Sequence, residues 1–275
     1  MMILAYLGPP GTYTEEAAER HDSTAKRMPY PSVAAAVAAV ENGKADEAVA
    51  AIENSIEGTV TDTVDLLIHE TTLSIRRELV IPISHCLLAK AGTKPASIEV
   101  VYSHVNALGQ CRRYLAEQLP KAQAVPALST VKAVEEAKAS ARPAAAIAPE
   151  RAAALYGVAV LAKGIQDNQV NATRFVVLAA KDHAPTGDDK TSIAFSFAED
   201  KPGQLYRVMG EFANRNLNLS KVESRPSKES LGKYVFLLDV GGHREDRPVR
   251  EAFEHVKALT SMWKVFGSYP RYKGT

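Results

Sequence analysis

The first two thirds of the 275-residue chain alternate short β-branched runs with alanine-rich stretches of helical length. This alternation is typical of βαβ units, in which helices cover a largely parallel sheet. We therefore expect an α/β fold over residues 1–180. The expected strands are 3–7, 48–52, 73–80, 85–89, 99–103, 145–148, 158–162 and 173–178, and the expected helices are 33–42, 62–69, 108–118, 131–139 and 150–156.

Residues 181–190 (KDHAPTGDDK) form a polar segment with Pro and Gly and no apolar period, which we interpret as a linker. The order of expected strands and helices changes after this segment. The pattern that follows indicates a strand, a helix, two strands, a helix and a strand. This βαββαβ order is that of a ferredoxin-like domain over residues 191–275. Its expected elements are 192–197, 203–214, 219–223, 234–240, 249–259 and 263–268.

Composition excludes several classes of function. The 33 Lys and Arg residues nearly balance the 32 Asp and Glu residues, so no net positive field would hold a nucleic acid. The longest strongly apolar stretch, 33–40, is far shorter than the roughly 20 residues that span a membrane. The first residues lack a basic region and a cleavage site, which favours a cytoplasmic protein. Cys86 and Cys111 lack the spacing of zinc or redox motifs, so we expect reduced thiols and no metal.

Polar clusters lie at the ends of several expected strands. GPPGTYT (8–14), ENSIEGTV (53–60) and SHVNALGQC (103–111) stand where a strand ends, and NATRF (171–175) begins the last strand before residues 181–190. Thr12 and Glu15 have capping-box spacing, which predicts a helix start that favours an anionic ligand. Each cluster alone also fits ordinary turn or surface chemistry, and we interpret His104 as structural. Together, without a metal-ligand pair or a Ser/His/Asp order, they indicate a site that binds a polyanionic small molecule by hydrogen bonds.

These four segments resemble the signature segments of the prephenate dehydratase family, and the resemblance covers nearly the whole chain. In the second domain, PGQLYRVM and KVESRP resemble the phenylalanine-binding segments of that family's ACT domain. The resemblance implies two α/β subdomains, with a substrate cleft between parallel-rich sheets, followed by the regulatory domain. Pro10, Asn106 and Gln204 depart from the family pattern, and Gln204 stands in the effector segment, where Ala is usual.

The resemblance also implies the reaction. Prephenate would lose its ring carboxylate as CO2 and its ring hydroxyl as water, giving phenylpyruvate without a cofactor or metal. Thr173 would donate a hydrogen bond to the leaving hydroxyl, and Arg174 would anchor a carboxylate. The other residues implied are Asn54, Ser55, Ser103, Gln110 and Thr12 for catalysis, and Gly11, Glu53 and Phe175 for substrate binding.

Feedback inhibition by L-phenylalanine and assembly into a homodimer or homotetramer are further implications of the ACT resemblance. The implied effector residues are Gly203, Leu205, Glu223, Ser224, Arg225 and Pro226. The plain interpretation of residues 223–226 is a strand that ends in Pro.

Other functions stay open at this point. Arogenate, the amino analogue of prephenate, is an alternative substrate. A non-catalytic sensor, with two lobes that close on an anion, would have a similar fold, although the hydroxyl of Thr173 favours an enzyme. A nicotinamide-dependent oxidoreductase is disfavoured because no expected strand is followed by GxGxxG.

Overall fold

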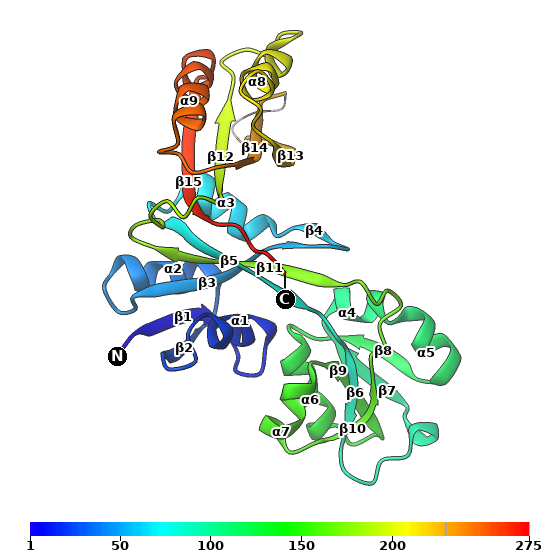
Figure 1. Ribbon diagram of the computed structural model, residues 1–275. Coiled ribbons are helices and arrows are strands. Elements are labelled where there is room, and N and C mark those ends of the chain that lie inside the picture. The colour runs from blue at the N-terminus through cyan, green and yellow to red at the C-terminus, as the bar shows by residue number, and fades with distance from the viewer. Residues whose placement is uncertain (229, 231, 275) are drawn as a thin grey trace. The chain divides into compact units, whose positions relative to one another are not determined.

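The computed structural model of the protein describes residues 1–228, 230 and 232–274. Its contacts divide the chain into two compact units. The first unit consists of Met1–Ala36, Val49–Val60 and Val80–Phe175, and the second consists of Val37–Ala48, Thr61–Leu79 and Val176–Thr275. Figure 1 shows the elements of both units, which are described separately here.

One sheet has the strand order β2-β1-β3-β11-β5, with β4 paired to β3. The bounds are β1 Ile3–Leu7, β2 Lys26–Tyr30, β3 Glu47–Asn54, β4 Gly58–Thr59, β5 Ser74–Pro82 and β11 Ala172–Ala179; the helices of this part of the chain are α1 Tyr13–His21, α2 Val33–Glu41 and α3 Thr61–His69. β1 and β2 pair in parallel, whereas β4 turns back antiparallel on β3. β2 and β4 were not expected from the sequence, because KRMPY has no β-branched residue and β4 has only two residues.

The second sheet has the order β10-β6-β9-β7-β8. The bounds are β6 Cys86–Ala89, β7 Val100–Ser103, β8 Gln123–Pro126, β9 Ala144–Ala148 and β10 Ala159–Lys163; the helices are α4 Val105–Gln110, α5 Arg112–Gln118, α6 Thr130–Ala139 and α7 Glu150–Tyr156. β7 pairs in parallel with β8 and β9, but β6 pairs antiparallel with β9 and β10. The second sheet is therefore mixed, with β7, β8 and β9 parallel and β6 antiparallel to its neighbours, a difference in direction that hydrophobic runs do not predict.

Both faces of this second sheet are apolar, as its continuous hydrophobic strands require. Leu87, Val101 and Ile147 pack with Cys111 and Leu119 from the α4–α5 side. Ala-rich positions on the other face pack with α6 and α7. The helix expected over 108–118 is interrupted at the buried residue Cys111, where the backbone leaves the helical region at φ −114° and ψ 19°.

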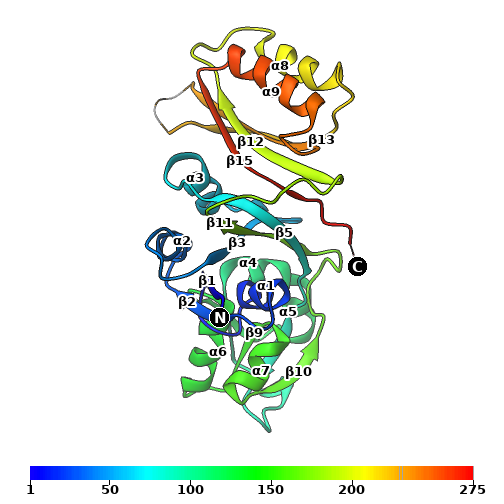
Figure 2. The ribbon, with the colours of Figure 1, turned by 60° about the vertical axis from the view of Figure 1, so that its left-hand side comes forward.

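The third sheet has the antiparallel order β13-β14-β12-β15, and the helices α8 and α9 cover one of its faces (Figure 2). The bounds are β12 Asp189–Ser196, α8 Gln204–Ala213, β13 Leu219–Pro226, β14 Tyr234–Gly241, α9 Arg247–Leu259 and β15 Met262–Pro270. Phe195, Phe212 and Phe253 form part of the core between this sheet and its helices. The ferredoxin-like order predicted from the sequence is confirmed.

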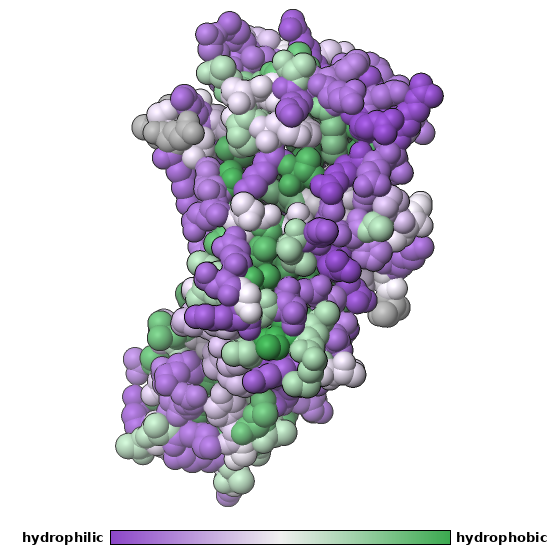
Figure 3. All heavy atoms as spheres, turned by 90° about the vertical axis from the view of Figure 1, so that its left-hand side faces the viewer, coloured by the Kyte–Doolittle hydropathy of each residue, from purple (hydrophilic) through white to green (hydrophobic). Residues whose placement is uncertain are grey.

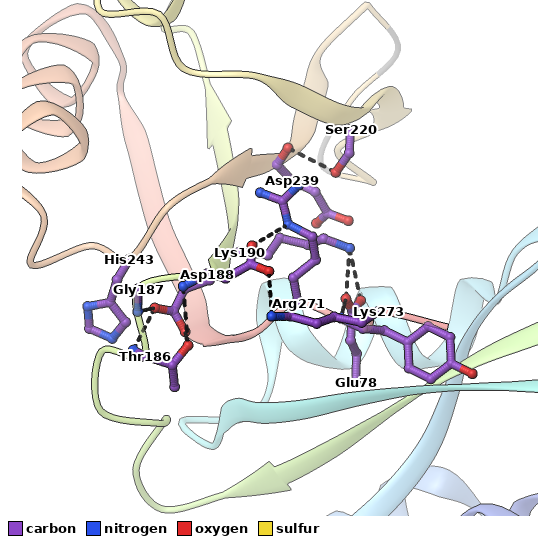
Figure 4. Close-up of polar contacts among 12 residues, drawn as sticks. Glu78, Thr186, Gly187, Asp188, Lys190, Ser220, Asp239, His243, Arg271 and Lys273 are labelled. Carbon is purple, nitrogen blue, oxygen red and sulfur yellow. Dashed lines mark hydrogen bonds and ion pairs between the residues drawn. The ribbon is translucent and has the colours of Figure 1, made fainter. Parts of the chain in front are cut away.

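Residues of α3 and β5 belong to the same compact unit as the third sheet. The buried carboxylate of Glu78 on β5 accepts two hydrogen bonds from Lys190 Nζ, at 3.0 and 2.9 Å, and one from the backbone N–H of Tyr272 (Figure 4). Lys264 Nζ on β15 donates to the carbonyl oxygens of Ile68 and Thr71, at 3.2 and 2.8 Å. A cation thus lies where the last carbonyls of α3 and the negative end of its dipole favour one.

No helix of the described residues is both long enough and apolar enough to span a bilayer. On the face drawn in Figure 3, hydrophilic residues interrupt the hydrophobic ones.

Candidate active site

The candidate site lies where β3 ends and β11 begins, two strands that are neighbours in the first sheet. Asn54 Nδ2 donates to Thr173 Oγ1 and to Asn171 Oδ1, each at 2.9 Å. Asn54 Oδ1 accepts from the backbone N–H groups of Ile56 and Glu57, at 2.9 and 3.0 Å. Because a backbone N–H can only donate, these two bonds fix which end of the Asn54 carboxamide is the oxygen.

The network continues to α4, which packs on the second sheet. Asn171 Nδ2 donates to Gln110 Oε1 at 2.9 Å, and Gln110 Nε2 donates to a carboxylate oxygen of Glu57 at 2.9 Å. His85 Nε2 lies 2.9 Å from Gln110 Oε1. An amide oxygen only accepts, so the His85 ring must carry its hydrogen on Nε2. Residues of both sheets of the first unit therefore meet in one hydrogen-bond network.

The Thr173 hydroxyl is oriented by this network. Its oxygen accepts from Asn54, and its own hydrogen has no acceptor among the described residues. The side chain lies at the edge of the interior, because the residue is 9% exposed. The hydroxyl hydrogen is therefore available to a ligand at this point, and the donor role of Thr173 stays a prediction.

Ser55 joins the segments before β4 and β11. Its Oγ accepts from the backbone N–H of Ala172 at 2.9 Å and donates to the carbonyl oxygen of Val170 at 3.2 Å. Both hydrogen-bonding functions of the hydroxyl are thus engaged by the backbone. The structure places Ser55 beside the Asn54–Thr173 pair, where it holds the two segments together.

The GPPGTYT turn opens α1 as the capping-box spacing predicts. Thr12 Oγ1 accepts from the backbone N–H of Glu15 at 3.3 Å, and a carboxylate oxygen of Glu15 accepts from the backbone N–H of Gly11 at 2.7 Å. Gly11 has a positive φ of 94°, and a Cβ there would lie 3.2 Å from Leu155 Cδ1. The helix start that the sequence analysis assigned to an anionic ligand therefore already holds a carboxylate of the chain itself.

Ser103 is apart from the Thr173 network. It is completely buried, and its Oγ donates to the carbonyl oxygen of Ile147 at 2.6 Å. The next residue, His104, caps α4 because its Nδ1 accepts from the backbone N–H of Asn106 at 3.3 Å. This contact agrees with the structural interpretation of His104, and the catalytic role of Ser103 stays a prediction.

Arg174 is also not brought together with Thr173. Successive side chains of a strand point to opposite faces, and the Arg174 guanidinium pairs with Glu53 at 3.1 Å. The role of Arg174 as an anchor for a substrate carboxylate stays a prediction. Phe175 shares the face of Thr173 but is only 1% exposed, so its side chain packs in the interior.

Burial determines the ionisation of several groups near the site. Burial lowers the pKa of His85, although the hydrogen bond to Gln110 acts in the opposite direction. His85 Nδ1 is buried and has no hydrogen-bond partner. Burial also raises the pKa of the Cys111 thiol to about 12, so this cysteine is unsuited to nucleophilic catalysis. The described residues include no cluster of three His, Cys, Asp or Glu side chains that could hold a metal ion.

The neutral state of His85 predicts how stability depends on pH. The unfolded histidine has a pKa of about 6.5 and takes up a proton more readily than the buried one, so acid favours unfolding. Below pH about 6.5, the stability of the wild type should fall more steeply than that of His85→Gln, by at most about 1.4 kcal/mol per pH unit. Denaturant unfolding at pH 7.5 and 5.5 measures the two slopes. Equal slopes would show that His85 does not titrate differently on folding.

The residues predicted to bind the effector lie on two faces of the third sheet. Gly203 precedes α8 with a φ of 84°, and Leu205 is in the first turn of that helix. On β13, Ser224 pairs with Phe236, which packs against the helix-side core. Ser224 and Pro226 therefore share the helix-covered face. Glu223 and Arg225 alternate with them and lie on the other face, where Arg225 pairs with Asp65 of α3 at 3.3 Å.

The fold and the site together define a class: an α/β protein with a polar site of carboxamide and hydroxyl groups, followed by a ferredoxin-like domain. The model of the prephenate dehydratase family matches residues 4–183, and the model of the ACT domain matches residues 191–256. The chain belongs to the prephenate dehydratase family.

Similar proteins extend this result. A bifunctional chorismate mutase/prephenate dehydratase of Aquifex aeolicus is 43% identical, with 98% of this chain and 73% of the relative covered. The crystal structure of prephenate dehydratase in complex with L-Phe from Arthrobacter aurescens has a TM-score of 0.91 and 37% identity, over 98% of this chain and 90% of that chain. GqqA, described as a novel type of quorum quenching acylase, has a TM-score of 0.87 and 29% identity, over 98% of both chains.

Three members of the network were absent from the site residues predicted from the sequence. Asn171 and Glu57 lie within two of the polar segments noted in the sequence, but nothing in the sequence indicated their roles in the network. No sequence feature pointed to His85, because its partner Gln110 is 25 residues away and the two residues belong to no recognisable motif.

Proposed function

We propose that the protein is a prephenate dehydratase, which converts prephenate to phenylpyruvate, CO2 and water in phenylalanine synthesis. Membership of the family supports this assignment. The observation that carries it is the orientation of Thr173, whose oxygen accepts from Asn54 while its hydrogen remains available to a ligand.

The reaction requires little covalent chemistry from the protein. The C–C bond to the ring carboxylate breaks, its electron pair enters the ring, and the C–O bond to the ring hydroxyl breaks. Aromatisation of the ring drives both steps. Negative charge develops on the departing oxygen, and a donor aimed at that oxygen stabilises the transition state. Thr173 is a very weak acid, so it acts as a hydrogen-bond donor to the developing hydroxide, which leaves as water after protonation.

The similarity to GqqA raises acyl hydrolysis as a competing function. Such chemistry needs a nucleophile within hydrogen-bond reach of a base. The adjacent residues Ser103 and His104 do not form that pair, because Ser103 donates to a buried carbonyl oxygen and His104 caps α4. The dehydratase therefore fits the site better than the acylase.

One assay tests the assignment and the two alternatives from the sequence. The purified protein is incubated with prephenate, and separately with arogenate, without any cofactor, and the products are identified. Phenylpyruvate from prephenate supports the proposal, and phenylalanine from arogenate would make the protein an arogenate dehydratase. If neither compound is consumed but both bind, the protein is a sensor.

We further propose feedback inhibition by L-phenylalanine, assembly into a homodimer or homotetramer, and a cytoplasmic location. The ACT match and the similarity to a structure in complex with L-Phe support the effector. ACT domains usually pair side by side, which supports the oligomer. The thiols of Cys86 and Cys111 are free and buried, as is usual in a reducing compartment.

Arg174→Lys tests the predicted carboxylate anchor. Lysine keeps the charge but loses the planar pair of donors, so KM for prephenate should rise several-fold with a smaller effect on kcat. Glu53→Gln is the matched control, because it breaks the same ion pair and leaves the guanidinium in place. If both variants lose stability and neither changes KM, Arg174 supports the two strands and does not bind substrate.

A further inference from the structure

His85 lies at the end of the hydrogen-bond network but outside every motif of the sequence. The residue is 4% exposed and directly precedes β6. Its backbone N–H donates to Gln166 Oε1 at 2.9 Å, and its ring contacts Gln110 through Nε2. The buried Nδ1 has no partner. Leaving the Nδ1 acceptor unpaired in the interior costs free energy, so we attribute the ring orientation to the hydrogen bond between Nε2 and Gln110.

The directions of the hydrogen bonds form one chain. The backbone N–H groups after Asn54 fix its oxygen, so its Nδ2 faces Thr173 and Asn171. Asn171 must therefore accept with Oδ1 and donate with Nδ2 to Gln110 Oε1. Gln110 Oε1 also faces His85 Nε2, and Gln110 Nε2 faces Glu57. Each amide is held in one of its two possible orientations by its neighbours.

We propose that His85 is a positioning residue, which fixes the Gln110 carboxamide through a hydrogen bond from Nε2. The inference rests on the proposed dehydratase function, because the network ends at the Thr173 hydroxyl. Without this donor, Asn171 and Glu57 still favour the same orientation of the Gln110 carboxamide, but Gln110 Oε1 keeps one donor instead of two. The carboxamide is then held less firmly, and so is Asn171, which shares Asn54 Nδ2 with Thr173.

Two substitutions of His85 separate this role from a packing role. His85→Gln places an amide N–H near the position of the histidine Nε2, whereas the shorter side chain of His85→Asn cannot reach Gln110. We expect His85→Asn to lower kcat roughly tenfold to a hundredfold with little change in KM, because Gln110 Oε1 loses one of its two donors and the carboxamide is held less firmly next to the site. His85→Gln should recover most of the loss. Leu87→Val, a change in the core two residues away, should lower stability without changing kcat of the folded protein.

A double-mutant cycle tests whether His85 acts through Gln110. In a Gln110→Leu background, His85→Asn should have no further effect on kcat, because the group that it positions is absent. Additive losses would overturn the inference, and so would equal kcat values for His85→Gln and His85→Asn.

A measurement without substrate keeps the inference separate from the proposed function. Nitrogen NMR shifts of the His85 ring in the wild type should show the hydrogen on Nε2, and the Gln110→Leu variant should lose that preference. A hydrogen on Nδ1 in the wild type would overturn the inference even if the enzyme is active. An inactive wild type with the expected ring state would instead count against the dehydratase function alone.

Discussion

Thr173→Val should lower kcat for prephenate by roughly 10²–10³, the loss typical of removing one transition-state hydrogen bond, with little change in KM. Valine has nearly the shape of threonine but cannot donate. In the structure, Asn54 donates to the Thr173 oxygen, and in the proposed reaction this leaves the hydroxyl hydrogen for the departing group. Steady-state kinetics on the folded variant measure the effect.

Thr173→Ser is the control for this prediction, because serine retains the hydroxyl and loses only a methyl group. It should keep most of the turnover. Near wild-type turnover in Thr173→Val would end the assignment of Thr173, whereas an equal loss in both variants would assign the effect to packing.

Saturating L-phenylalanine should weaken prephenate binding by roughly 5–150-fold, the range of typical coupling free energies of about 1–3 kcal/mol. Arg225→Ala should abolish this effect and leave basal turnover intact. Arg225 on β13 pairs with Asp65 of α3, and α3 begins at Thr61, immediately after the segment that contains Asn54. A ligand that changes the position of β13 would therefore act on the helix that follows a catalytic segment.

Calorimetry tests the coupling from both sides, because prephenate must weaken L-phenylalanine binding by the same factor. Asp65→Asn should reduce the coupling as Arg225→Ala does. Arg247→Ala, which removes an exposed arginine that pairs with Glu251 of the same helix, is the matched control and should leave the coupling intact. If L-phenylalanine does not bind the wild type while catalysis is normal, the regulatory proposal fails and the enzyme proposal stands.

Local sequence patterns predicted most elements because capping and hydrophobic period are local properties. Thr12 with Glu15 predicted the start of α1, and α7, expected over 150–156, ends at Gly157, which has a positive φ. β2 and β8 were missed because KRMPY and QAVP have neither a β-branched run nor an alternation. Strand direction in the second sheet was not predictable, since it depends on pairing between distant segments.

The site was predictable as a set of segments but not as a geometry. Asn54 and Thr173 were expected to lie close together because both stand at strand ends. The separation of Arg174 from Thr173 follows from strand alternation alone and could have been predicted. The same alternation separates Glu223 and Arg225 from Ser224 and Pro226, but which pair faces the helices could not be predicted, because the register of β13 shifts between Leu219 and Lys221.

The contacts of Glu78 and Lys264 bear on how regulatory domains could be exchanged between members of this family. A chimaera joined at the polar segment 181–188 would transplant Lys190, Lys264 and Tyr272 but leave behind α3 and β5. The recipient would then have to supply its own partners for a buried carboxylate and for the last carbonyls of a helix. The transferable unit is therefore the whole second compact unit, residues 37–48, 61–79 and 176–275, and a graft of this unit keeps each of these charges with the groups that neutralise it.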